Sequence, residues 1–133
     1  MQLTLREGLL YVDLSVVYRL QNRRIPNVVI DTGSARTVLS ADWLAKIGLV
    51  PERYDTLYTV RGIGGTEVVF ARQVDQLNIG PVSLTHIEIE VGGLDYGFTL
   101  NGILGVDLLR RSQAILDMAA LELTFKQDLH DAG

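Results

Sequence analysis

Residues 25–34 read Ile-Pro-Asn-Val-Val-Ile-Asp-Thr-Gly-Ser, a short apolar run that stops abruptly at an aspartate. A β-branched run of this length is typical of an inner strand. An ionised carboxylate directly after a buried strand is unfavourable unless hydrogen-bond donors surround it, and Thr32, Gly33 and Ser34 supply hydroxyls and turn amides. Asp31 is therefore a candidate functional residue. An Asx or Ser/Thr turn that only satisfies local amides is the other interpretation of the same residues.

The flanking sequence predicts many short strands and little helix. Residues 10–18 alternate with a period of two, and residues 21–24 predict a polar turn before the strand at 25–30. Further strands are predicted over residues 56–61, 67–72, 74–79, 82–91, 98–104, 114–118 and 121–126. Ser40 can cap a helix over residues 41–47, and a second short helix is predicted over residues 106–111. The pattern predicts an all-β, mainly antiparallel single domain over residues 1–133, closed or nearly closed into a β-barrel.

Gly62, Ile63, Gly64 and Gly65 separate two of these predicted strands. They predict a β-hairpin whose tip has unusual backbone freedom. A dinucleotide-binding loop is a poor alternative, because the third glycine is missing and the following residues are strand-like rather than helical.

Several motifs occur in a fixed order along the chain. They are the apolar pair before Asp31-Thr32-Gly33-Ser34, the helix ending in Gly48-Leu49, the glycine-rich hairpin at 62–65, Ile103-Leu104-Gly105 running into a helix, and the closing Ile115-Leu116-Asp117 with residues 121–125. In that order they resemble the single-lobe, retropepsin-like aspartic proteases (clan AA), most closely the bacterial and cellular members. The resemblance covers nearly the whole chain, from about residue 9 to residue 125.

This resemblance implies a retropepsin-like acid-protease fold and a homodimeric aspartic endopeptidase. Peptide hydrolysis by paired carboxylates needs one ionised group and one protonated group, and the chain has only one Asp-Thr-Gly. A twofold axis would bring the catalytic Asp31 of each subunit together. By the same resemblance, Thr32 would brace the two active-site loops, Gly33 would allow the tight turn, and Ser34 would hydrogen-bond the Asp31 carboxylate.

The resemblance also assigns the other motifs. Residues Gly62, Ile63, Gly64 and Gly65 would form a flap that closes over an extended peptide, with Tyr58 as a candidate substrate contact on its incoming strand. Ile103, Leu104 and Gly105 would pack behind the Asp31 loop as a structural second motif. The chain departs from the retroviral pattern where Val106 follows Gly105 in place of a common arginine, and Met1 to Glu7 do not match the retroviral terminus, so the outer dimer contacts cannot be carried over.

Composition limits the alternatives. The chain has 133 residues, a net charge of -4 and no cysteine, so we expect no nucleic-acid partner, no disulfides, no metal site and no cofactor. No apolar stretch is long enough to span a membrane, which favours a soluble, cytoplasmic chain. A serine triad of Ser34 with His86 is disfavoured because no nucleophile elbow is present. The remaining alternative is a retropepsin-like dimer that binds peptides or proteins without cleaving them.

Overall fold

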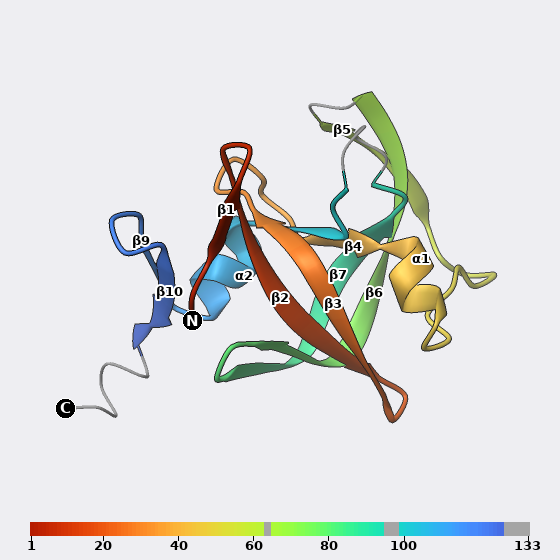
Figure 1. The fold of residues 1–133 in the computed structure, drawn as a ribbon. Coiled ribbons are helices and arrows are strands. Elements are labelled where there is room, and N and C mark those ends of the chain that lie inside the picture. The colour runs from red at the N-terminus through yellow and green to blue at the C-terminus, as the bar shows by residue number, and fades with distance from the viewer. Residues whose placement is uncertain (63–64, 95–98, 127–133) are drawn as a thin grey trace.

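The computed structural model describes residues 1–62, 65–94 and 99–126, and nearly all of its regular structure is strand (Figure 1). The strands are β1 (Thr4–Arg6), β2 (Leu9–Tyr18), β3 (Gln21–Ile30), β4 (Val38–Ser40), β5 (Leu57–Gly62), β6 (Gly65–Ile79), β7 (Val82–Gly92), β8 (Gly102–Leu104), β9 (Ala114–Asp117) and β10 (Glu122–Phe125). The helices are α1 (Ala41–Ala45) and α2 (Val106–Arg111). Within the described ranges, no helix is long and apolar enough to cross a membrane. The predicted all-β architecture with two short helices is confirmed.

Eight strands form one sheet in the order β1-β2-β3-β8-β4-β7-β6-β5, and β2 pairs in addition with β6. This extra pairing runs from Ser15–Asn78 to Val17–Gln76. It closes the six strands from β2 to β6 in the sheet order into a ring. Most pairings are antiparallel, but β8 runs parallel to β3, and β4 runs parallel to β7. The main apolar core is enclosed by this curved sheet and includes fully buried Val16, Leu39 and Leu77.

A second, smaller apolar cluster lies on the other face of the sheet. We call it the smaller cluster; its buried members are Tyr11, Val29, Val38, Val69, Leu94 and Leu100. Side chains alternate between the two faces of a strand. In β3, Val28 and Ile30 accordingly belong to the main core, whereas Val29 belongs to the smaller cluster. The same alternation carries Asp31 to the face of the smaller cluster.

Several predicted boundaries differ from the structure. The predicted turn at residues 21–24 is wrong: these residues belong to β3, and the turn is made by Arg19 and Leu20, both at positive φ. The reason is cross-strand pairing, since polar Gln21 to Arg24 lie opposite β2 at the exposed end of the hairpin. The strands predicted at 67–72 and 74–79 form one strand, β6. The strand predicted over 98–104 is reduced to β8, with residue 98 outside the described residues.

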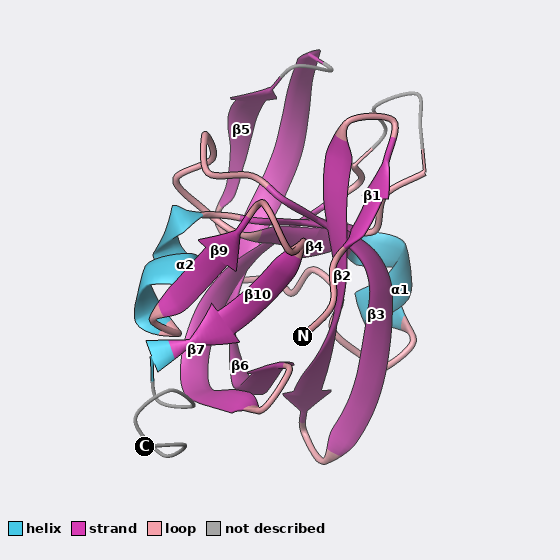
Figure 2. Cartoon of the chain, turned by 60° about the vertical axis from the view of Figure 1, so that its left-hand side comes forward, coloured by secondary structure: helices cyan, strands magenta, loops and turns pink. Residues whose placement is uncertain are grey.

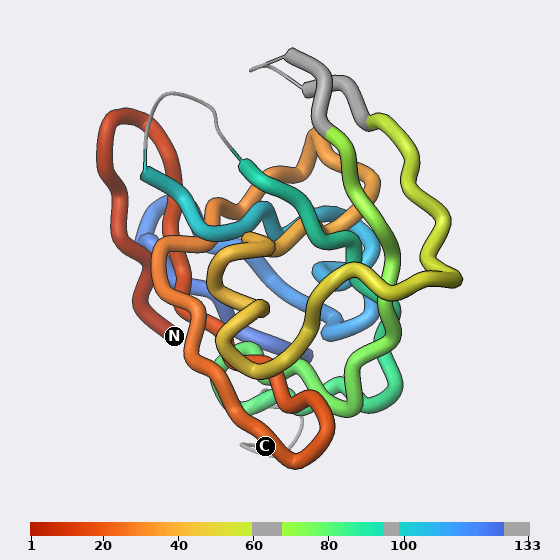
Figure 3. The backbone as a smooth tube through the Cα atoms, turned by 90° about the vertical axis from the view of Figure 1, so that its right-hand side faces the viewer, coloured from red at the N-terminus to blue at the C-terminus, as the bar shows by residue number. Residues whose placement is uncertain are grey.

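The β5–β6 hairpin projects at one end of the molecule and the β2–β3 hairpin tip lies at the other (Figure 3). The loop that leads into β5 is fastened to β6 by Arg72. Its guanidinium donates to the carbonyl oxygen of Val50 at 3.1 Å, to the hydroxyl of Tyr18 at 2.9 Å and to the carboxylate of Asp55. The base of the projecting hairpin is thereby tied to the body of the sheet.

The first three residues and the last two strands form a separate sheet. β9 and β10 form an antiparallel hairpin, and the segment before β1 pairs with the other edge of β10. The Leu123 amide donates to the carbonyl oxygen of Met1 at 2.9 Å, and the Leu3 amide donates to that of Leu121 at 2.8 Å. Met1 to Leu3, β10 and β9 therefore lie side by side within one chain. Figure 2 shows β9 next to α2 and β10 on its other side.

Candidate active site

β3 and β8 together position Asp31. The two strands run parallel in the register Val29–Ile103 and Ile30–Leu104. The Asp31 amide continues this pairing by donating to the carbonyl oxygen of Leu104 at 3.0 Å. The Asp31 side chain is half-buried and follows strand alternation onto the face of the smaller cluster. The sequence placed Asp31 at the end of an inner strand, and the structure has it there.

The turn after Asp31 supplies a donor to its carboxylate. The Gly33 amide donates to Asp31 Oδ1 at 2.9 Å, and the Ser34 amide donates to the Asp31 carbonyl oxygen at 3.1 Å. A Cβ atom at position 33 would lie 3.2 Å from Asp31 Oδ1, closer than an ordinary contact. Glycine therefore lets the turn close tightly around the carboxylate, as an Asx turn does.

The side chains of Ser34 and Thr32 lie in different surroundings. The Ser34 hydroxyl donates to the carbonyl oxygen of Arg36 at 2.8 Å, in place of the Asp31 carboxylate that the resemblance implied. Thr32 is exposed and borders a pocket of about 500 Å³, which we call the Thr32 pocket. The pocket is lined by Thr32, Val106, Leu109, Arg110, Gln113, Ala114 and Lys126. Ser34 thus stabilises the loop within the chain, whereas Thr32 faces outward.

Gly105 lies directly behind the Asp31 loop. A Cβ atom at this position would lie 2.6 Å from the carbonyl oxygen of Arg36 and 2.8 Å from that of Ser34. Both are backbone atoms, so no side-chain rotation could relieve the overlap. The close approach allows the Val106 amide to donate to the Ser34 carbonyl oxygen at 2.8 Å. Gly105, at the end of β8, therefore packs directly against the backbone of the loop that follows Asp31.

Thr37 and Asp107, which hold the loop after Asp31 in place, were not predicted from the sequence. The Asp107 carboxylate accepts hydrogen bonds from the hydroxyl and the amide of buried Thr37, at 2.7 and 3.0 Å. The Thr37 hydroxyl oxygen in turn accepts from the Gly105 amide at 3.0 Å. The only signal in the sequence was an aspartate in the first turn of the second helix, where carboxylates are generally favourable.

The flap motif is described only in part. β5 and β6 pair from Leu57–Phe70 up to Gly62–Gly65, whereas Ile63 and Gly64 lie outside the described residues. Tyr58 is half-buried and packs against the smaller cluster. Burial, and then a hydrogen bond to the Glu90 carboxylate, raise the pKa of the Tyr58 hydroxyl above its ordinary value. Tyr58, on the predicted flap strand, therefore packs on the face of the sheet that carries the smaller cluster.

Glu90 is a third residue that the sequence did not indicate. It is a buried carboxylate on β7, and Arg36 Nε lies 3.5 Å from its Oε1. Arg36 follows the Asp31 loop, while Tyr58 belongs to β5, the predicted flap strand. Glu90 therefore contacts groups from both sides of the candidate site, and its cation partner lessens the unfavourable desolvation of the carboxylate.

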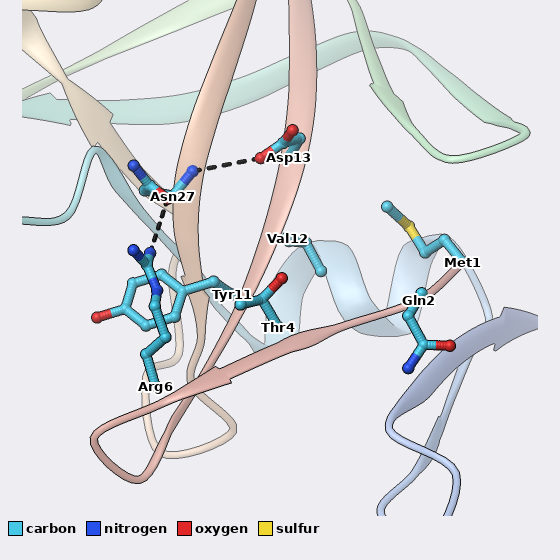
Figure 4. A pocket seen from close by; sticks show the side chains of 8 residues that line it. All are labelled: Met1, Gln2, Thr4, Arg6, Tyr11, Val12, Asp13 and Asn27. Carbon is cyan, nitrogen blue, oxygen red and sulfur yellow. Dashed lines mark hydrogen bonds between the residues drawn. The ribbon is translucent and has the colours of Figure 1, made fainter.

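A separate pocket of about 290 Å³ lies against the β1–β2 and β2–β3 pairs (Figure 4). Its lining is mostly polar: Met1, Gln2, Thr4, Arg6, Tyr11, Val12, Asp13 and Asn27. Arg6 stacks 4.2 Å from the centre of the Tyr11 ring and donates to Asn27 Oδ1 at 2.7 Å. Arg6, Asn27 and Asp13 are thus linked by hydrogen bonds beside the irregular pairing between Val12 and Leu14, and none of the lining residues belongs to the Asp31 loop.

Comparisons with known proteins agree with this arrangement. A family model described as aspartyl protease matches residues 16–108, which is more than half of the chain. The crystal structure of a retropepsin-like aspartic protease from Rickettsia conorii matches with a TM-score of 0.60 and 22% sequence identity, covering 85% of this chain and 88% of that chain. No curated protein matches the chain. The structural match confirms the predicted retropepsin-like fold.

Proposed function

The chain belongs to the aspartyl protease family, and on that premise we propose that it is a homodimeric aspartic endopeptidase with Asp31 of each subunit as its catalytic pair. The observation that carries the proposal is the placement of Asp31. Its half-buried carboxylate ends an inner strand, accepts the Gly33 amide, and lies on the same face as the flap strand and the smaller cluster.

The chemistry requires a second carboxylate. One ionised Asp31 takes a proton from water, whose oxygen attacks the carbonyl carbon of the scissile bond, while the protonated Asp31 of the other subunit donates to the carbonyl oxygen. Collapse of the resulting gem-diol breaks the C–N bond, and a proton passes to the leaving amine. The chain has one Asp-Thr-Gly, so a symmetric pair of chains supplies both carboxylates.

The partly buried side chains that pack on the smaller cluster, Leu9, Tyr58 and Ile103, give the substrate a surface. An extended peptide lying between the β5–β6 hairpin and Asp31 would run over the smaller cluster, with half-buried Tyr58 and Ile103 at its edge. Extended peptides bind sheet proteins through backbone hydrogen bonds, and pockets for alternate side chains give selectivity. Apolar side chains flanking the cleaved bond would fit this surface best.

Cleavage of a diverse peptide mixture from about pH 3.5 to 7.5 tests the proposal, with products identified by mass spectrometry. The unmodified chain should produce cuts that Asp31→Asn does not. Because asparagine keeps the shape of the side chain, Asp31→Asn should retain the fold and the dimer, as measured by circular dichroism and sedimentation equilibrium. Cleavage by Asp31→Asn at the wild-type rate would refute the assignment. A folded, dimeric wild-type chain that cuts nothing would instead support a peptide-binding role.

A further inference from the structure

We propose that Glu90 is a positioning residue for substrate binding, whose buried carboxylate holds the side chains of Tyr58 and Arg36 in place for contact with the peptide. The inference rests on the proposed function and deepens it, because it names a group that determines how tightly the peptide binds. Glu90 is 6% exposed, and no other charged residue in the described part of the chain is as deeply buried. A buried carboxylate is unfavourable unless polar partners surround it, so its partners explain its presence.

Strand pairing places Glu90 between the segment that follows the Asp31 loop and the β5–β6 hairpin. On one side, Glu90 lies opposite Val38 of β4, and its amide donates to the carbonyl oxygen of Thr37 at 3.0 Å. On the other side, it lies opposite Ala71 of β6. The backbone of Glu90 is therefore held by a paired strand on each side, independently of what its carboxylate contacts.

Tyr58 reaches the Glu90 carboxylate across β6. Tyr58 lies opposite Val69, which is two residues from Ala71 and therefore shares its face of β6. The Tyr58 side chain crosses that face to donate its hydroxyl hydrogen bond to Glu90. Position 71 carries only a methyl group, which leaves room for this reach. Glu90 thereby holds the Tyr58 ring against the smaller cluster, at one side of the proposed substrate surface.

Arg36 approaches the same carboxylate from the other side. Its Nε lies 3.5 Å from Glu90 Oε1, and its Nη2 lies 3.8 Å from Oε1 of the exposed Glu88. The Thr37 side chain bonds to the first turn of α2, so strand alternation directs Arg36 and Val38 to the opposite face, where Val38 joins the smaller cluster. The Arg36 side chain is 59% exposed, so its guanidinium contacts the buried carboxylate and still faces solvent.

Ordering both side chains before the peptide arrives makes binding more favourable. A long side chain that a ligand immobilises loses rotamer freedom, and this loss weakens binding. Glu90 has already ordered Tyr58 and Arg36, so the peptide meets a preformed surface. Contacts of these two side chains with parts of the peptide away from the cleaved bond stabilise the ground state and the transition state equally. Removing Glu90 should therefore raise KM and leave kcat unchanged.

Steady-state cleavage kinetics of three variants test this role. Glu90→Leu removes the acceptor of both contacts and should raise KM about tenfold. Glu90→Gln keeps an oxygen that can accept from Tyr58, so KM should rise only about threefold, and this variant decides the question if Glu90→Leu does not fold. Glu88→Gln is the matched control: it removes a carboxylate that also lies near Arg36, and its KM should equal that of wild type. A purely structural role would instead lower the folded fraction, which decreases the apparent kcat and leaves KM unchanged.

Calorimetric titration measures peptide binding separately from cleavage. The probe is a peptide from the same mixture that immobilised Asp31→Asn retains, and its Kd should rise about tenfold when Glu90→Leu is added to Asp31→Asn. If wild type cleaves peptides but Glu90→Leu changes neither KM nor Kd, the positioning role of Glu90 is wrong while the protease function stands. If wild type cleaves nothing but Kd rises as expected, the positioning role stands and the proposed catalysis fails. A chain that neither cleaves nor retains any peptide would refute both.

Discussion

The Thr37 hydroxyl donates a hydrogen bond to Asp107 Oδ1 at 2.7 Å, across 70 residues of sequence. This contact, with the bond from the Thr37 amide at 3.0 Å, holds the segment after Asp31 against the first turn of α2. It therefore links the position of the candidate catalytic loop to a helix that also borders the Thr32 pocket.

Removing either partner of this contact should destabilise the chain. Asp107→Ala leaves the buried Thr37 donors without an acceptor and should lower the free energy of unfolding by about 2 kcal/mol. Thr37→Val should have a similar effect, and the double variant should lose less than the sum, because the two residues share one network. Urea unfolding of all three variants measures the coupling. Thr85→Val, at an exposed site on β7, is the control. If the losses of unfolding free energy in the two single variants add up fully in the double variant, Thr37 and Asp107 do not share an interaction.

Gly105→Ala should disturb the Asp31 loop directly. The added methyl would overlap the Arg36 carbonyl oxygen at 2.6 Å, so the loop must shift, and overpacking of this kind costs about 1–3 kcal/mol. The rate of peptide cleavage should fall by more than the increase in the unfolded fraction explains. Gly8→Ala is the comparison: it places a methyl in open space at φ +79°, where only backbone strain of about 1 kcal/mol is expected. Equal cleavage by the two folded variants would argue against the supporting role of Gly105.

Acid should loosen the loop before β5. The Glu52 amide, followed by the Arg72 guanidinium, holds the pKa of Asp55 below its ordinary value, despite the opposing effect of burial. A carboxylate with a lowered pKa in the folded state contributes stability above its unfolded pKa, and this contribution is lost as the pH falls below about 4. Asp55→Asn should therefore show a flatter dependence of the urea midpoint on pH between about 5 and 3. Parallel curves for the variant and wild type would refute this role of Asp55.

Alkali should destabilise the packing of β5 through Tyr58. Burial and the bond to Glu90 raise the pKa of its hydroxyl, so the neutral form is favoured in the folded chain. This contribution to stability is present below the ordinary tyrosine pKa, about 10, and is lost as the pH rises through the raised value. Tyr58→Phe should remove one ionisation above about pH 10 from the ultraviolet titration of the folded chain. A variant that instead loses an ionisation at or below about pH 10 would show that the pKa of Tyr58 is not raised.

The sequence predicted the parts of the fold that depend on local pattern. The period-two strand at β2, the Ser40 cap of α1, whose hydroxyl accepts from the Trp43 amide, and the strand ending at Asp31 are all present. Contacts between distant residues gave no local signal. Thr37–Asp107 and Arg36–Glu90 depend on β8 inserting between β3 and β4, a topology that no local spacing encodes. The polar start of β3 was misjudged for the same reason, since pairing with β2 overrides the turn preference of its residues.

The pairing of Met1 to Leu3 with β10 of the same chain has a consequence for the order of assembly. Subunits that exchange their termini would complete part of their structure only on meeting a partner. Here each chain can close its terminal sheet alone, so folding should precede association. After dilution from urea, fluorescence of Trp43, the single tryptophan, should recover at a rate independent of protein concentration, whereas cleavage should recover with second-order kinetics.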